Sequence, residues 1–93
     1  MYEDKVREIE NFVKELFKRV LNIEVRPESK ITLKGLEITL DCDKEKKGMI
    51  LGKKGRTMRN FRRIVKIMGK YVYGGNIEIF LKPDNNEKDK ATI

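Results

Sequence analysis

The spacing of apolar residues alternates between a helical and a strand period along this 93-residue chain. Between residues 3 and 21 the apolar side chains recur in steps of three and four, which is typical of a helix with one buried face. The charged residues between them are of mixed sign and indicate a solvated outer surface. The positions expected on the buried face are Val6, Ile9, Val13, Leu16, Phe17 and Val20.

From residue 23 to residue 40 the period changes to two. Two alternating runs lie on either side of Lys34 and Gly35, and this arrangement predicts a β-hairpin that turns at these two residues. Pro27 fits only near the start or at the edge of the first strand, because proline donates no hydrogen bond to a neighbouring strand. The apolar positions of the hairpin are Ile31, Leu33, Leu36, Ile38 and Leu40.

The second half of the chain repeats this change of period. Asp43 is a candidate side-chain cap for a short helix over residues 44–51, and a longer helix is expected over residues 56–73. The sequence Gly74-Gly75-Asn76 ends the longer helix, and a last strand covers residues 77–82 before Pro83. The longer helix should bury Met58, Phe61, Ile64, Val65, Met68 and Val72.

These elements predict a single α+β domain over residues 1–82, in the order helix, strand, strand, helix, helix, strand. We expect a three-stranded sheet with the helices packed on one face, because each element has only one apolar face to bury. Residues 83–93 are polar and without a period, so they are expected to form a flexible tail.

The composition excludes several kinds of chemistry. The chain has no His and only one Cys, so it lacks Ser–His and Cys–His catalytic pairs, most zinc sites and an intramolecular disulfide. No apolar run is long enough to span a membrane, and the N-terminus does not resemble a secretory signal. We therefore expect a cytoplasmic protein that is not an enzyme and that requires no cofactor or metal.

The net charge of +7 is concentrated in one part of the chain. Residues 1–43 carry −2, residues 44–82 carry +10 and residues 83–93 carry −1. Within the basic part, six cations of the longer helix share one sector of a helical wheel, roughly 100° to 220° from Phe61 at about 100° per residue. That sector contains no acidic residue, which favours a polyanion such as nucleic acid as the partner. The six cations are Arg56, Arg59, Arg62, Arg63, Lys66 and Lys70.

The sequence Gly52-Lys53-Lys54-Gly55 joins the two expected helices. The first backbone N–H groups of a helix have no helical acceptor, and the helix dipole adds positive potential, so a phosphate can bind there. Glycines at both ends allow the backbone to approach a phosphate, and the two lysines add charge. A turn that merely bends the chain is the alternative interpretation, because this motif alone has low specificity.

Two further features refine the loop hypothesis. Gly48 and Gly52 are four residues apart, so both should lie on one stripe of the short helix, where the missing side chains leave room for a base or a sugar. Close packing of this helix against the sheet is the alternative. The loop does not match the Walker sequence or the GxGxxG dinucleotide motif, so nucleotide hydrolysis is not supported.

The stretch from Gly48 to Thr57, followed by Asn60-Phe61-Arg62, resembles the core of a KH domain. The element order is similar to the type II arrangement, and the likeness to small bacterial KhpA proteins and to the KH module of Jag (KhpB) covers residues 4–82. The resemblance implies binding of about four nucleotides of single-stranded RNA, with the backbone held at the GxxG loop. The candidate RNA-binding residues are Gly48, Ile50, Gly52, Lys53, Lys54, Gly55, Arg56, Arg59 and Arg63.

Other functions and constellations remain as alternatives. The chain could be a protein-interaction adaptor in a ribonucleoprotein or ribosome-assembly complex, and a homodimer or a second KH-containing protein is a candidate partner. Tyr71 and Tyr73 could stack on bases, but packing or a dimer contact is the favoured interpretation. Asp41 and Asp43 could form an acidic pair, but a strand end followed by a helix cap is favoured, with Cys42 as a small core residue.

Overall fold

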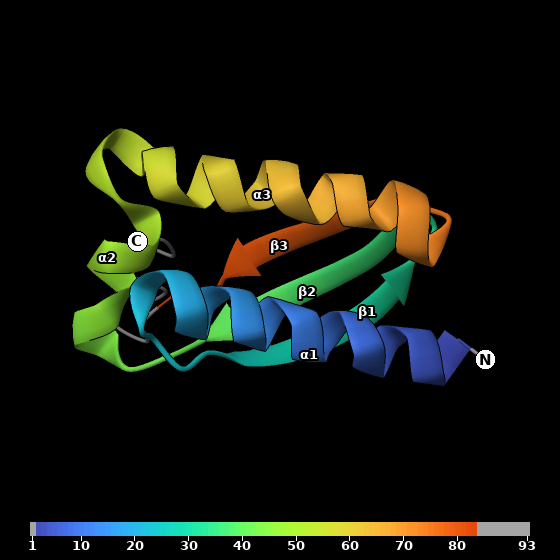
Figure 1. Cartoon of the computed structure of the whole chain (residues 1–93), viewed down its shortest axis with the longest axis horizontal. Coiled ribbons are helices and arrows are strands. Elements are labelled where there is room, and N and C mark those ends of the chain that lie inside the picture. Colours follow the sequence, from blue (N-terminus) through green and yellow to red (C-terminus); the bar gives the residue numbers. More distant parts are fainter. Residues whose placement is uncertain (1, 84–93) are drawn as a thin grey trace, which may run out of the picture.

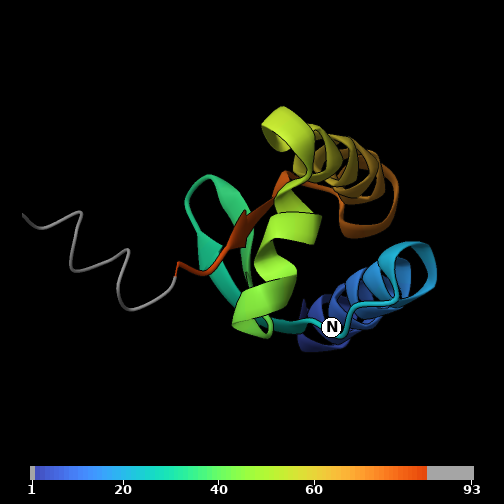
Figure 2. The ribbon, with the colours of Figure 1, turned by 90° about the vertical axis from the view of Figure 1, so that its left-hand side faces the viewer.

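Helices α1 and α3 lie on the same face of a three-stranded sheet in the computed structural model, which describes residues 2–83 (Figure 1). The view in Figure 2 confirms that both helices are on one side of the sheet. The observed α+β fold therefore has the expected order and layers. The elements are α1 (Tyr2–Leu21), β1 (Arg26–Thr32), β2 (Gly35–Asp41), η1 (Lys44–Lys46), α2 (Lys47–Leu51), η2 (Lys53–Gly55), α3 (Arg56–Met68), η3 (Gly69–Tyr73) and β3 (Ile77–Leu81).

The strand order in the sheet is β1-β2-β3. β1 and β2 are antiparallel, as a hairpin requires, whereas β2 and β3 are parallel. The helices between β2 and β3 provide the long crossover that a parallel pair needs. β1 is an edge strand, so Pro27, at its second position, lies where the sequence predicted it.

The core lies between the sheet and the two long helices. Alternate residues of β2 and β3 are buried, and α1 contributes Ile9, Val13 and Phe17 to the same cluster. The expected stripe of α1 is wrong at Val20, which is 61% exposed. The chain reverses at Asn22, which has a φ of +57°, and Ile23 just beyond it is buried instead.

The hairpin turns one residue earlier than expected. Thr32 pairs with Gly35, so Leu33 and Lys34 form the two-residue turn and the Leu33 side chain is fully exposed. Gly35 is the first residue of β2, and a side chain is disfavoured there because a Cβ would lie 2.3 Å from the carbonyl oxygen of Asn76. The same oxygen accepts the Leu36 N–H at 2.9 Å, so the position of the turn depends on a distant part of the chain.

The helix expected over residues 44–51 is divided into two short elements, η1 and α2. Asp43 has the extended backbone of a cap residue, but its side chain makes no capping hydrogen bond. Its carbonyl oxygen accepts the Lys46 N–H at 2.9 Å instead. The prediction of a side-chain cap was therefore wrong, although the start of the helical segment was correct.

The helix expected over residues 56–73 is α-helical only as far as Met68 and continues as the wider π turn η3. Gly69 is buried at this change, and a Cβ there would lie 2.6 Å from the carbonyl oxygen of Gly75. A wider turn shifts the phase of the residues that follow, and Val72 is 38% exposed rather than buried. Gly74, with a φ of +79°, ends the helix as predicted and donates its N–H to the Gly69 carbonyl.

The last strand and the chain end complete the domain. Ile77 and Ile79 are buried as the alternation predicted, and the Lys82 N–H donates to the Leu40 carbonyl at 2.8 Å. The predicted tail lies outside the described residues except for Pro83. Among the helices of the described chain, none combines the length and the apolar character that crossing a membrane requires.

Candidate nucleic-acid interface

The glycine loop between α2 and α3 forms a short 3-10 turn with its own hydrogen bonds. The Gly55 N–H donates to the Gly52 carbonyl at 3.1 Å, and the Arg56 N–H donates to the Lys53 carbonyl. The expectation that the first N–H groups of the longer helix all lack acceptors was therefore wrong. Because these two amides are used inside the loop, the lysine side chains become its main candidate phosphate ligands.

Lys53 and Lys54 are the exposed residues at the tip of this loop. Lys54 has a φ of +55° and a ψ of +27°, the left-handed conformation that a residue with a Cβ rarely adopts. This conformation costs about 1–2 kcal/mol for an L-residue, so the surrounding contacts must stabilise it. Two ammonium groups are therefore carried by a sharply bent and specifically shaped piece of backbone.

The glycines next to the loop have different structural roles. Gly48 is exposed on α2, and a Cβ added there would have no neighbour within 4 Å. Gly52 lies beyond the end of α2 with a φ of +74°, and its Cβ would lie 2.1 Å from Oγ1 of Thr57. The expected stripe of two bare glycines is therefore wrong for Gly52, which instead allows Thr57 to pack against the loop.

Ile50 is the candidate residue that the structure removes from the surface. Its side chain is completely buried in the core cluster. Ile50 is the buried residue of the five-residue helix α2, and it anchors this helix in the core. The role of Ile50 in RNA binding stays a prediction, and its buried side chain holds the helix that precedes the loop.

The six cations predicted for the basic face are all exposed, five of them on α3 and Lys70 in η3. Two of them donate hydrogen bonds to backbone carbonyls that the sequence could not identify. Nη2 of Arg59 lies 3.1 Å from the Lys54 oxygen, and Nε of Arg62 lies 3.2 Å from the Ile79 oxygen. Nζ of Lys70 lies 5.6 Å from the centre of the Tyr71 ring, within cation–π range.

A groove of about 240 Å³ lies beside the basic face, between α3 and β3. Sequence reasoning missed it because the groove depends on how the helix crosses the strand rather than on a local pattern. Its wall on α3 is cationic and its wall on β3 is mostly apolar, with one carboxylate. The lining residues are Arg62, Lys66, Ile77, Glu78, Ile79 and Phe80.

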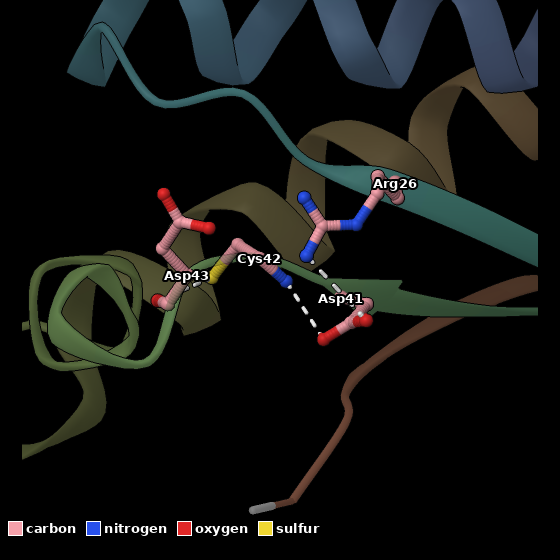
Figure 3. Close-up of polar contacts among 4 residues, drawn as sticks. All are labelled: Arg26, Asp41, Cys42 and Asp43. Atoms are coloured by element: carbon pink, nitrogen blue, oxygen red, sulfur yellow. Dashed lines mark hydrogen bonds and ion pairs between the residues drawn. The ribbon is translucent and has the colours of Figure 1, made fainter.

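The two carboxylates next to Cys42 have separate surroundings. Oδ1 of Asp41 accepts the Cys42 N–H at 2.9 Å, and Oδ2 lies 3.5 Å from Nη2 of Arg26, whereas the Asp43 carboxylate points elsewhere (Figure 3). Within residues 2–83, no group of three or more His, Cys, Asp or Glu side chains could hold a metal. Cys42 is buried as predicted, and burial raises the pKa of its thiol.

The two tyrosines at the end of the longer helix have separate environments. Tyr73 is partly buried and packs against the core cluster, as the packing interpretation predicted. Tyr71 is 76% exposed beside Lys70. Tyr71 is therefore the only one of this pair whose ring is largely accessible to a partner.

The sequence was compared with models of known protein families and with curated proteins. A family model described as the KH domain of KhpA and KhpB matches residues 7–85 of the chain. The match therefore includes most of α1, the whole sheet and the glycine loop. A comparison with curated proteins finds no match.

Proposed function

Because this chain belongs to the KhpA/KhpB family of KH domains, we propose that it binds single-stranded RNA and clamps about four nucleotides at the GxxG loop of residues 52–55. Proteins of this family are generally not enzymes, and the proposed role is likewise non-catalytic. An RNA chaperone or a post-transcriptional regulator is the corresponding cellular role. The observation that carries the proposal is the exposed Lys53–Lys54 pair at the loop, next to a helix face that bears six cations and no acid.

Phosphates are the part of the RNA that this site is built to hold. Lys53 and Lys54 extend two mobile charges from a bent backbone, and Arg56 and Arg63 continue the positive surface along α3. Such contacts hold the nucleic-acid backbone and carry little base information. The open surface at Gly48, where a Cβ would have no neighbour, is the proposed position for a sugar or a base.

The salt dependence of binding tests this proposal. A footprint of four nucleotides offers three or four phosphates, and each neutralised phosphate of a single strand contributes about −0.7 to the slope of log K against log salt. We expect a slope of about −2 to −3 for the purified protein and a labelled single-stranded RNA, measured by fluorescence anisotropy. A tenfold rise in salt should then weaken binding roughly 100- to 1,000-fold.

Two other slopes would contradict this description of the site. A slope near zero would mean that phosphates are not the ligand, and RNA binding at this site would be rejected. A slope near −6 would mean that the whole basic face of α3 follows the backbone, which would reject the loop-centred footprint but keep RNA as the partner. A double-stranded RNA of the same length serves as the comparison ligand.

A second candidate function, association with another KH protein or with a second copy, is favoured by a different side of α3. Ile64, Ile67 and Tyr71 follow one another at helical spacing and are 41%, 59% and 76% exposed. On the wheel Ile64 and Ile67 lie between the cationic sector and the buried face, and Tyr71 follows them in the π turn η3. A row of exposed apolar side chains is typical of an interaction surface, and here it leaves the proposed RNA face accessible.

Substitutions at the adjacent positions 66 and 67 distinguish the proposed RNA-binding face from the apolar row. We expect Ile67→Glu to weaken self-association of the full chain at least tenfold, measured by sedimentation equilibrium, because it places a charge in the apolar row. RNA affinity should change less than about threefold, because Ile67 is not among the proposed phosphate ligands. Lys66→Glu is the matched control on the cationic flank and should leave association unchanged. A protein that remains monomeric at all concentrations would exclude the second copy as the partner.

A further inference from the structure

We propose that Arg59 is a positioning residue that holds the GxxG loop in its binding conformation, rather than a direct phosphate ligand. The inference rests on the proposed RNA-binding function and assigns a role to one of its candidate residues. Nη2 of Arg59 donates to the Lys54 carbonyl oxygen at 3.1 Å. This contact joins the helix to the backbone of the loop that precedes it.

The spacing along the chain explains how the contact forms. Arg59 follows Lys54 by five residues and lies in the first turns of α3. Long side chains on a helix point towards its N-terminus, so the guanidinium extends back over the loop. The contact therefore depends on the shape of the loop and would be lost if the Lys54 carbonyl turned away.

The peptide group between Lys54 and Gly55 is held at both ends. Its carbonyl oxygen accepts from Arg59, and its N–H donates to the Gly52 carbonyl at 3.1 Å. Gly55 allows this peptide group to rotate, because glycine populates positive and negative φ about equally. The Arg59 contact therefore favours the one orientation of this peptide group in which Lys54 has a ψ of +27° and Gly55 has a φ of +74°.

This arrangement gives Arg59 a different effect from that of Lys53 or Arg63. Loss of a positioning residue lowers the fraction of loops in the binding conformation, and the apparent Kd rises in inverse proportion to that fraction. The number of neutralised phosphates stays the same, so the salt slope is preserved. Loss of a phosphate ligand instead reduces the magnitude of the slope by about 0.7.

The experiment compares two replacements of Arg59 in the full chain. Arg59→Met removes both the charge and the hydrogen bond, whereas citrulline, introduced by chemical synthesis, removes the charge but keeps planar N–H donors. We expect Arg59→Met to raise the Kd for a labelled single-stranded RNA about five- to tenfold at fixed salt, with the slope unchanged within about 0.3. The protein with citrulline at position 59 should bind the RNA with a Kd within about threefold of the wild-type value.

A second measurement needs no RNA. In the free protein, ¹⁵N relaxation dispersion at the Gly55 amide should be flat for wild type and for the citrulline protein, and should show exchange for Arg59→Met. Arg63→Met is the matched control on the same face, and we expect it to reduce the slope by about 0.7 without exchange at Gly55.

The opposite pattern would overturn the inference. In that case, both replacements of Arg59 reduce the magnitude of the salt slope by about 0.7 and leave the relaxation-dispersion profile of the Gly55 amide flat. Arg59 is then a phosphate ligand and not a positioning residue. If wild type does not bind RNA, the proposed function fails, while exchange at Gly55 still decides whether Arg59 holds the loop.

Discussion

Reversal of the two loop charges, Lys53→Asp together with Lys54→Asp, should weaken RNA binding at least about 100-fold. Two charge-assisted contacts, each contributing about 1.5–3 kcal/mol, would be replaced by repulsion. The salt slope should become flatter by one to two units, equally for every RNA sequence tested, because these contacts involve phosphates. Aspartate tolerates the left-handed conformation at position 54, so the fold of the loop should be retained.

The matched control reverses the same amount of charge on α1. Arg7→Glu with Lys14→Glu changes two exposed cations of a mixed-sign surface and should leave the slope unchanged. Self-association should be the same in both double variants. A loop variant that binds RNA within threefold of wild type would exclude residues 52–55 as the phosphate site.

Phe61→Ala should destabilise the protein by about 3–5 kcal/mol, measured as the free energy of unfolding in urea. Phe61 is almost completely buried, and its ring stacks on Phe17 with centroids 4.2 Å apart and an angle of 20° between the planes. The substitution would remove the main aromatic contact between α1 and α3, and it would leave a cavity in a small core. A loss of this size is a large part of the stability expected for such a domain.

The prediction that Ile64 is buried was wrong, because it lies at the edge of the apolar stripe and is 41% exposed. Ile64→Ala is therefore the control, since Ile64 lies one turn further along the same helix than Phe61. It should cost less than about 1 kcal/mol, since most of the removed surface contacts water already. Equal losses at positions 61 and 64 would contradict the orientation of α3 and, with it, the outward direction of the basic face.

The repeating features of this molecule could be predicted from the sequence. Phe61 and Val65 are buried because helical spacing places them on one side, and Ile77 and Ile79 are buried because strand spacing does the same. The six cations of the longer helix are exposed because that spacing places them away from its apolar face. The position of the GxxG loop followed from its composition, since its glycines and lysines interrupt two apolar patterns.

The sequence by itself therefore determined the order of the elements, the buried sides of the helices and the place of the loop, all of which depend on the residues nearest along the chain. Only the tertiary structure decided which residues of the candidate site remain at the surface and what they contact. Ile50 is buried in the core, a side chain at position 52 would collide with Thr57, and Arg62 donates a hydrogen bond to the Ile79 carbonyl. These outcomes depend on backbone angles and on contacts across the fold, which a local spacing of residues does not specify.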